Sequence, residues 1–304
     1  MKYVIGIDGG GTKTKATSFS SPEGEPLFSV QKGRANFTVQ YEDSLKQVVE
    51  CVEACIESAG GVLPEKILVG AAGAHSPEIC MAVEADLRKV WACEIVVTSD
   101  AQLAHTALLE GSDGLLVISG TGSIVLGRHN GIEWKTGGWG YLLGDEGSGY
   151  WIGIQALQHV MRVLERNGGA NVNGKAGFDD RLTSVVLKHI GGDSMSDVKN
   201  YVYTGTKEDI SSLSRLVGDT AEAGCEMSSL ILRGAGVELA RLVVDRAVLG
   251  HEEMLASMKV AVSGSILMKN EIVFEAFRNI VSQNFPDCEI VRSAGDVCRG
   301  VLYI

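Results

Sequence analysis

A glycine-rich turn between two strand-like runs opens the chain and limits what it can fold into. The apolar residues 4–7 end at Asp8, glycines occupy positions 9–11, and a second run begins shortly after Thr12 and Lys13. Since glycine has no Cβ, such a turn lets several backbone N–H groups approach a bound anion. Thr12 and Lys13 would add a hydroxyl and an ammonium group, and Asp8 would face the accompanying cation. The segment therefore predicts a strand–turn–strand unit that binds a nucleotide phosphate with Mg²⁺.

The same composition is also typical of an ordinary β-hairpin. Asp-Gly and Gly-Gly pairs are strong hairpin signals, and many hairpins bind nothing. The segment is neither a Walker A loop nor a Rossmann fingerprint, because both lead into a helix and here the strand-like residues 16–19 follow. The segment by itself is compatible with a plain turn and with a phosphate site, so the other motifs of the chain are needed to distinguish them.

A second segment repeats this pattern. Residues 115–119 form an apolar run, a turn with Gly120, Thr121 and Gly122 follows, and residues 123–125 resume the strand pattern. Repetition of a whole strand–turn–strand unit indicates a duplicated architecture. We therefore predict two similar α/β domains.

The domain boundary is expected at the glycine-containing residues 111–114. This gives an N-terminal domain over residues 1–112 and a C-terminal domain over residues 113–304 with a helical insertion, and the last residues are expected to return to the first domain. Apolar residues at helical spacing predict a helix over residues 41–59 and a last insertion helix over residues 221–249. The predicted apolar stripe of that last helix consists of Leu230, Val237, Ala240, Val244 and Val248.

Charge and cysteine content exclude several classes of partner. The net charge is −11 with no basic run, which argues against nucleic acid and acidic membrane surfaces. No apolar run approaches the ~18–20 residues of a membrane span, and the N-terminus lacks the pattern of a signal peptide. The seven cysteines contain no CxxC pair and are expected to be buried as small apolar residues. We expect a cytoplasmic protein.

Two further strand ends carry candidate ligand-binding residues. Asp100 closely follows the predicted strand at residues 94–98, and Gly264 and Ser265 follow the one at residues 259–263. In open α/β sheets, ligands bind at the carboxyl ends of the strands. We therefore expect the turns and Asp100 to meet in one cleft between the domains, where two turns grip a polyphosphate and the third packs against a base or ribose.

This arrangement resembles the sugar kinase/heat-shock/actin superfamily, and within it the BadF/BadG/BcrA/BcrD-type ATPases, most of all their N-acetylglucosamine kinases. The matching stretches are residues 6–14, the loop at Asn36, residues 99–101, 118–123 and 262–265, and, most specifically, residues 137–153. The resemblance implies an α/β fold of two ribonuclease H-like (actin-like ATPase) domains facing each other across a cleft.

The resemblance also implies roles for the matching residues. Asp8 would hold Mg²⁺, and Asp100 would be the general base. The nucleotide would be bound by Asp8, Gly10, Gly11, Thr12, Lys13, Gly120, Thr121, Gly122, Gly264 and Ser265. The sugar would be bound by Asn36, Asp100, Gly138, Trp139, Gly140 and Asp145.

The activity implied is ATP-dependent phosphorylation of the 6-hydroxyl of an amino sugar, N-acetylglucosamine first, with glucosamine and N-acetylmuramic acid as alternatives. The expected partners are that sugar, ATP and Mg²⁺, and a homodimer stays open. A different class is the iron–sulfur activator ATPase of 2-hydroxyacyl-CoA dehydratases, although the Ser-Gly-Thr-Gly-Ser turn at residues 119–123 differs from the Gly-Gly-Gln-Asp turn of that branch. A sugar sensor without turnover is a third reading.

Several candidates have a purely structural alternative. Asp100 could be only the N-cap of the following helix, and Asp145 and Ser148 could cap the helix after residue 147. Asn36 could be only a turn former. Trp139 could be a core residue, as tryptophans more often are than ligand contacts, and only its glycine neighbours, which expose backbone amides beside it, favour a ligand contact.

Overall fold

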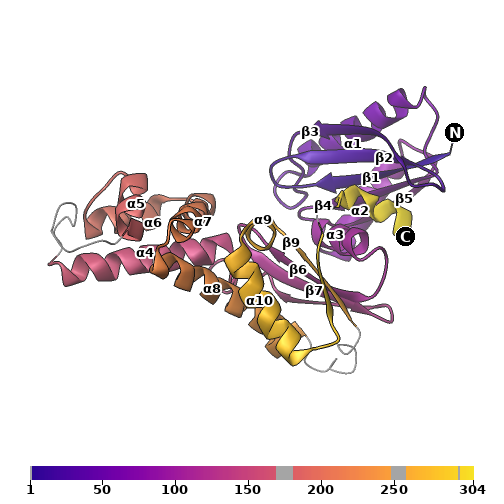
Figure 1. Cartoon of the computed structure of the whole chain (residues 1–304). Helices are drawn as coiled ribbons and strands as arrows, with labels where there is room; N and C mark the ends of the chain where they lie inside the picture. Colours follow the sequence, from indigo (N-terminus) through magenta and orange to yellow (C-terminus); the bar gives the residue numbers. More distant parts are fainter. Residues whose placement is uncertain (1, 169–180, 248–257, 294) are drawn as a thin grey trace. The chain divides into compact units, whose positions relative to one another are not determined.

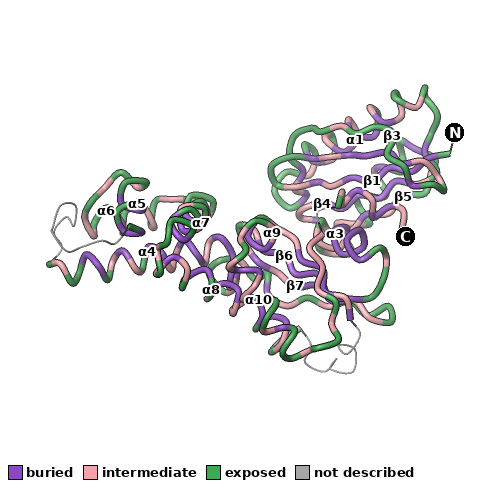
Figure 2. Tube along the Cα trace, in the orientation of Figure 1, coloured by how far each residue is buried: buried purple, intermediate pink, exposed green. Residues whose placement is uncertain are grey.

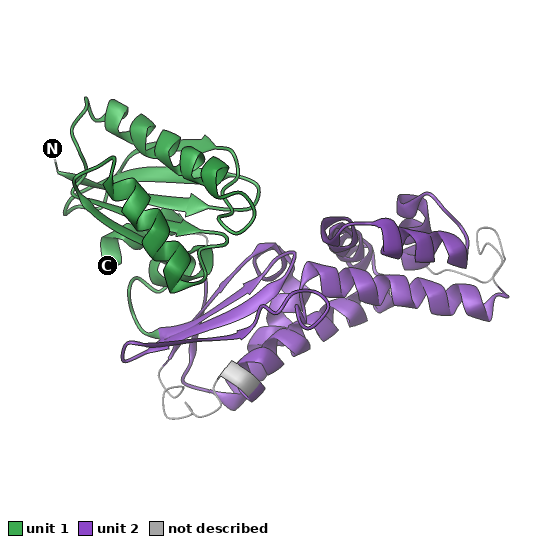
Figure 3. Cartoon of the chain, turned by 180° about the vertical axis from the view of Figure 1, so that it is seen from behind, with its two compact units in different colours: residues 1–113, 293–304 green, residues 114–292 purple. Residues whose placement is uncertain are grey.

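Two mixed five-stranded sheets carry the fold, one in each of two units (Figures 1 and 3). The computed structural model describes residues 2–168, 181–247, 258–293 and 295–304. Unit 1 comprises residues 1–113 together with residues 293–304, and unit 2 comprises residues 114–292. The final segment of the chain thus groups with the first unit.

The sheet of unit 1 has the order β3-β2-β1-β4-β5. β1, β2 and β3 are antiparallel neighbours, whereas β4 and β5 run parallel to β1. The strands are β1 (Tyr3–Gly9), β2 (Thr14–Ser20), β3 (Pro26–Lys32), β4 (Lys66–Ala71) and β5 (Glu94–Ser99). The strand–turn–strand unit predicted for the N-terminus is therefore confirmed as β1 and β2.

Both faces of this sheet are covered, so its central strands are buried (Figure 2). Alternate side chains of β1, including Ile5 and Ile7, pack against α1 (Tyr41–Ser58) and α2 (Pro77–Arg88). On the opposite face, Val4 belongs to a cluster with residues of α3 (Asp100–Leu108) and of the terminal 3-10 helix η3 (Val297–Tyr303). This alternation follows from the two-residue period of a strand.

The C-terminal segment crosses directly over β1. A Cβ on Gly6 would collide with the carbonyl oxygen of Cys298, so only glycine fits at this point of the strand. Asp296 also binds the sheet, because its Oδ2 lies 2.8 Å from Lys15 Nζ and accepts a hydrogen bond of 3.0 Å from Thr17 Oγ1. These contacts hold η3 on the face of the sheet that α3 also covers.

We expect the substitution Gly6→Ala to destabilise unit 1 by about 1–3 kcal/mol or more, because the added methyl group meets backbone that cannot rotate away. Gly295→Ala is the matched control, since its Cβ would find its nearest neighbours, in Leu108 and Ser293, at 3.7 Å. Chemical denaturation of both variants measures the difference. Equal stability of the two variants would contradict the close crossing.

The sheet of unit 2 repeats the arrangement of unit 1. Its order is β10-β9-β6-β7-β8, in which β6, β7 and β8 are antiparallel and β9 and β10 run parallel to β6. The strands are β6 (Gly114–Ser119), β7 (Ser123–His129), β8 (Ile132–Gly137), β9 (Lys259–Ser263) and β10 (Glu289–Arg292). The duplication read from the two glycine turns is thus visible as two sheets of equivalent strand order.

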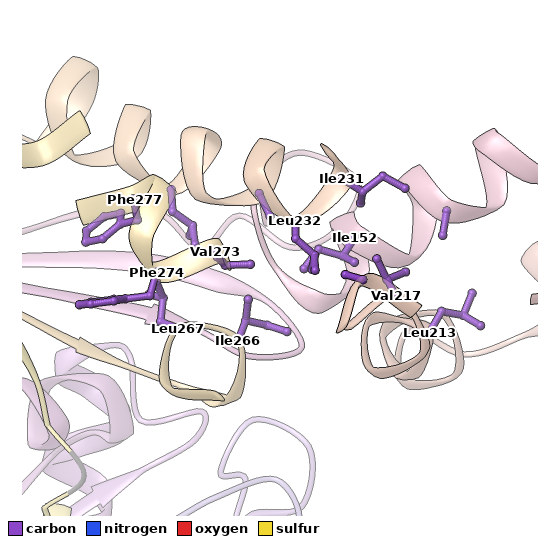
Figure 4. Packing of buried hydrophobic residues seen from close by; sticks show 14 of the residues in the cluster. Ile152, Leu213, Val217, Ile231, Leu232, Ile266, Leu267, Val273, Phe274 and Phe277 are labelled. Atoms are coloured by element: carbon purple, nitrogen blue, oxygen red, sulfur yellow. The ribbon is translucent and has the colours of Figure 1, made fainter. Parts of the chain in front are cut away.

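Helices of unit 2 share one hydrophobic cluster with its sheet (Figure 4). Ile152, Val217 and Leu232, from three different helices, all belong to it and are buried. The helices are α4 (Gly149–Arg166), α5 (Arg181–Ile190), α6 (Met195–Thr204), α7 (Lys207–Glu222), α8 (Glu226–Arg241), the π-helix η1 (Leu242–Ala247), α9 (Ser265–Lys269) and α10 (Glu271–Asn284).

The predicted helix over residues 221–249 is wrong at its start and in its buried face. α7 ends at Glu222, Gly224 follows with a φ of +88°, and the last long helix begins only at Glu226. Leu230, expected in the apolar stripe, is 50% exposed, whereas Ile231 and Leu232 are buried. Of the predicted stripe, Val248 lies outside the described residues. Among the described residues, no helix is long and apolar enough to cross a membrane.

Candidate functional site

The first glycine turn presents an open surface at the end of β1 and β2. The strands pair as far as Gly9 and Thr14, and the N–H of Gly10 then donates to the carbonyl oxygen of Lys13 at 2.8 Å. Thr12 and Lys13 are exposed. A Cβ on Gly11 would meet nothing within 4 Å, and its φ lies outside the left-handed region. Neither backbone conformation nor a neighbouring residue requires glycine at position 11, and the residue is exposed.

Asp8 lies at the end of β1 among other charged groups of unit 1. Burial raises the pKa of the Asp8 carboxyl above its ordinary value, and the carboxylates of Asp100 and Asp296 raise that pKa further. Lys13 and Lys15 act in the opposite direction. The carboxylates of Asp8 and Asp100 therefore interact, although β4 lies between β1 and β5, the strands that lead to them.

Asp100 is the first residue of α3, and it is not the N-cap. Ser99 caps the helix, because its Oγ accepts a hydrogen bond of 3.1 Å from the N–H of Gln102 in a complete capping box. The capping alternative for Asp100 is therefore wrong. The Asp100 residue is exposed, yet loss of solvation around its carboxyl raises the pKa, and hydrogen bonds from backbone N–H groups only partly offset this. One of these bonds joins Ala101 N–H to Oδ1 at 2.9 Å.

Asn36 forms the turn that its residue type favours. Its Oδ1 accepts a hydrogen bond from the N–H of Thr38 at 3.1 Å, and its own N–H donates to Ser44 Oγ at 2.8 Å. A Cβ on Gly73 would lie 2.6 Å from Asn36 Oδ1. The side-chain oxygen thus has a structural role, and the Nδ2 amide is the part of the side chain suited to a ligand.

The second glycine turn is anchored on the start of α4. The N–H of Gly120 donates to the carbonyl oxygen of Gly122 at 2.9 Å, which closes the turn between β6 and β7. The N–H of Gly149 donates to the Gly120 carbonyl at 2.8 Å, and the N–H of Tyr150 donates to the Thr121 carbonyl at 3.3 Å. The turn and the first residues of α4 therefore form one hydrogen-bonded substructure.

Asp145 lies buried beside this turn. The residue is 3% exposed and its φ is +59°, which is unusual for a residue other than glycine. Its Oδ1 accepts a hydrogen bond of 3.2 Å from the N–H of Ser123, and its Oδ2 lies 2.7 Å from Lys207 Nζ. A Cβ on Gly122 would lie 2.9 Å from both carboxylate oxygens. The second glycine turn and Asp145 are thus in direct contact.

The helix-capping alternative applies to Ser148 and not to Asp145. Ser148 is the N-cap of α4, since its Oγ accepts a hydrogen bond of 3.2 Å from the N–H of Trp151. The Asp145 carboxylate does not cap the helix and instead contacts Ser123 and Lys207.

The loop before Asp145 exposes an aromatic ring. Gly138 and Gly140, with φ values of +68° and +83°, flank Trp139. Trp139 is 58% exposed, and Lys135 Nζ lies 4.7 Å from the centre of its ring. The core alternative for Trp139 is therefore wrong, since more than half of the residue is exposed.

A cavity of about 570 Å³ lies beside the second and third glycine turns of unit 2. Gly264 has a φ of +87°, and a Cβ there would collide with the backbone of Ser119, so the turn requires glycine. Thr121 and Ser265 both line the cavity, which brings together two residues predicted to bind the same nucleotide.

The other wall of this cavity comes from α7, to which the sequence analysis assigned no role. Ser211, Ser214, Arg215 and Gly218 of this helix line the cavity. Their spacing of three, four and seven residues from Ser211 places them on one helical face. Small and polar residues at this helical spacing were the sequence signal that could have identified α7 as a wall of the cavity.

Lys207 is a second residue that the sequence analysis did not identify. It is the first residue of α7, where a positive charge opposes the helix dipole. Its ammonium group pairs with Asp145 and also lies 5.9 Å from the centre of the Tyr141 ring. The sequence signal that could have identified Lys207 was a positive charge at the start of a predicted helix, where it is unfavourable.

The predicted residues form two sets, one in each unit. Unit 1 holds the first turn, Asn36 and the neighbouring carboxylates Asp8 and Asp100. Unit 2 holds the second turn in contact with Asp145, the exposed Trp139 loop, and the cavity lined by Thr121 and Ser265.

Known proteins resemble this chain over its whole length. It is 32% identical over 314 residues to the N-acetylmuramic acid/N-acetylglucosamine kinase of Clostridium acetobutylicum, covering 100% of this chain and 98% of that protein. It is 28% identical over 319 residues to the N-acetyl-D-glucosamine kinase of Dictyostelium discoideum, covering 98% and 96%. A solved structure assigned as an N-acetylglucosamine kinase of Chromobacterium violaceum superimposes with a TM-score of 0.72 and 25% identity over 99% of this chain and 98% of that one.

These comparisons confirm the α/β fold of two ribonuclease H-like, actin-like ATPase units that the family resemblance implied. The profile of the BadF/BadG/BcrA/BcrD ATPase family matches residues 5–297. The chain therefore belongs to the BadF/BadG/BcrA/BcrD ATPase family.

Proposed function

We propose that this protein is an ATP-dependent kinase that phosphorylates the 6-hydroxyl of an amino sugar, most favourably N-acetylglucosamine. The similarity along the whole chain to two proteins named as N-acetylglucosamine kinases supports the substrate class. The observation that supports the chemistry is the presence in unit 1 of two interacting carboxylates, Asp8 and Asp100, whose pKa values are both raised mainly by burial, as is typical of functional sites.

The nucleotide is assigned to the cavity of unit 2, which the second and third glycine turns flank, and to the first glycine turn. A volume of about 570 Å³ falls in the usual range for small-molecule sites. Gly264 and Ser265 line the adenosine side, and Gly120, Thr121 and Gly122 offer backbone and hydroxyl groups to the phosphates. In unit 1, the terminal phosphates face Thr12, Lys13 and the open backbone at Gly11, while Gly10 closes the turn through its hydrogen bond to Lys13.

Asp8 is the residue proposed to hold Mg²⁺. Mg²⁺ usually keeps several waters and binds through one or two carboxylates together with substrate phosphates. Its site therefore needs no cage of protein ligands, and among the described residues no group of three or more His, Cys, Asp or Glu could form one. The crowding of carboxylates that raises the pKa of Asp8 fits a cation there. Bound Mg²⁺ would neutralise charge on the β- and γ-phosphates.

The sugar is assigned to Asn36 and Asp100 of unit 1 and to Gly138, Trp139, Gly140 and Asp145 of unit 2. Hydroxyl groups suit the Asn36 amide and the carboxylates, and the exposed ring of Trp139 suits the apolar face of a sugar. Asp100 then removes the proton from the 6-hydroxyl as this oxygen attacks the γ-phosphorus. The bond from the γ-phosphorus to the bridging oxygen of ADP breaks, and the proton remains on Asp100.

A panel of amino sugars with ATP and Mg²⁺, read as ADP release, tests the proposal. We expect N-acetylglucosamine to stimulate ADP release, and N-acetylmuramic acid and glucosamine to show how wide the specificity is. If no sugar stimulates ADP release, the kinase proposal is contradicted and the activator ATPase becomes the favoured alternative. The names of the full-length relatives favour the kinase over that class.

A further inference from the structure

Lys207 connects the Asp145 carboxylate to the helix that lines the nucleotide cavity. Its Nζ lies 2.7 Å from Asp145 Oδ2, and the two side chains are 26% and 4% exposed. A buried carboxylate without a partner is costly, so this ion pair strongly favours one relative position of Asp145 and the start of α7.

Lys207 stands at a position where its charge weakens its own helix. Thr206 caps α7 in a capping box with Asp209, which makes Lys207 the first helical residue. Positive charge in the first turn of a helix is unfavourable, because the N–H groups there already carry a partial positive charge. The ion pair with Asp145 offsets the unfavourable interaction of Lys207 with the helix dipole. The ion pair, and not a contribution to helix formation, therefore explains a lysine at this position.

The two partners of the ion pair belong to different parts of the proposed site. Asp145 contacts Gly122 of the second phosphate turn, and it lies in the loop that also carries Trp139. One and two helical turns beyond Lys207, Ser211 and Ser214 of α7 line the nucleotide cavity. A Cβ on Gly153 of α4 would collide with the Ile210 backbone, so α7 also packs closely on the helix that anchors the phosphate turn.

We propose that Lys207 is a positioning residue that couples nucleotide binding in the cavity to sugar binding at the Asp145 loop. A nucleotide that contacts α7 restricts the motion of the start of this helix. Because Lys207 pairs with Asp145, the position of the Asp145 carboxylate, which is assigned to the sugar, is then also restricted. By thermodynamic linkage, the sugar then strengthens nucleotide binding by the same factor. This inference rests on the proposed function and adds a residue and a coupling to it.

The test measures the dissociation constant of N-acetylglucosamine by calorimetry, with and without a non-hydrolysable ATP analogue and Mg²⁺. In the wild type, we expect the analogue to tighten sugar binding about 5–150-fold, the usual range of such couplings. In Lys207→Met, this ratio is expected to fall close to one, and in Lys207→Arg it is expected to recover, because arginine keeps the charge. A merely structural lysine would leave the ratio unchanged.

Lys199→Met is the matched control. Lys199 lies in the same group of helices and, like Lys207, has its ammonium group 5.9 Å from a tyrosine ring, that of Tyr203. We expect this variant to keep the wild-type coupling. Should Lys207→Met not fold, Lys207→Gln replaces it in the same comparison.

The outcomes separate the coupling from the proposed function. A wild type that binds sugar and nucleotide independently keeps the proposed function and overturns the coupling, as does a methionine or glutamine variant that retains the full ratio. A wild type that binds the ATP analogue but none of the amino sugars overturns both. Loss of coupling in Lys207→Met together with its return in Lys207→Arg supports the proposal.

Discussion

The substitution Asp100→Asn is expected to lower kcat for sugar phosphorylation about 10²–10⁴-fold, the usual contribution of a positioned general base. Asparagine has nearly the same shape and cannot take a proton from the sugar hydroxyl. The dissociation constant of an ATP analogue is expected to stay within about twofold of the wild type, because the base acts on the sugar side of the reaction. Steady-state kinetics and calorimetry together measure both quantities.

The pH profile gives the same assignment a second test. Loss of solvation raises the pKa of Asp100, so the carboxyl becomes protonated, and inactive as a base, at a higher pH than an ordinary aspartate. We therefore expect wild-type kcat/KM to fall as the pH decreases through this raised pKa. The residual activity of Asp100→Asn should lack this acidic limb.

Asp43→Asn is the control for helix stability. Asp43 lies in the first turn of α1, so its replacement removes a carboxylate from a helix start of the same unit, as Asp100→Asn does. The two variants should have similar stability, within the roughly 0.3–1 kcal/mol that such charges contribute. If Asp100→Asn phosphorylates the sugar at the wild-type rate, the base assignment is wrong.

The substitution Asp8→Asn is expected to reduce kcat on the order of 10²-fold or more and to raise the Mg²⁺ concentration needed for half-maximal activity. The expected size follows from the several kcal/mol of transition-state stabilisation that a metal ion supplies in such reactions. Titration of activity with MgCl₂ at saturating ATP and sugar measures both effects.

Asp296→Asn is the matched control for Asp8→Asn. Asp296 also raises the pKa of Asp8, but its carboxylate is already paired with Lys15 and bonded to Thr17. Its replacement removes a nearby negative charge and leaves Asp8 in place, so the Mg²⁺ requirement should change little while the stability of unit 1 falls. An equal rise in Mg²⁺ requirement in both variants would show that local charge matters and that Asp8 is no ligand.

Much of each sheet could be predicted because its signals are local. The turn after Asp8 and the turn at Gly120 each follow an apolar run, and clustered glycines directly after such a run indicate a tight turn. The break at Gly224 illustrates the limit of such signals. A single glycine is tolerated inside many helices, so the sequence pattern predicted one helix across the boundary between α7 and α8.

The capping assignments required the three-dimensional structure. Ser99 and Asp100 are neighbours, and both residue types make good N-caps. Only the positions of their side chains show that Ser99 bonds to Gln102 and that Asp100 is left for another role. The same holds for Ser148 and Asp145 at the start of α4.

The sequence by itself determined the two strand–turn–strand units, their duplication and the positions of Asp8 and Asp100 at strand ends, because hydrophobic alternation and glycine turns act over a few residues. Only the tertiary structure decided that α7 lines the cavity beside Thr121 and Ser265, and that Lys207 pairs with Asp145. These partners lie far apart along the chain. The packing of α4 against α7 brings them together, and no local pattern encodes which helical faces will meet.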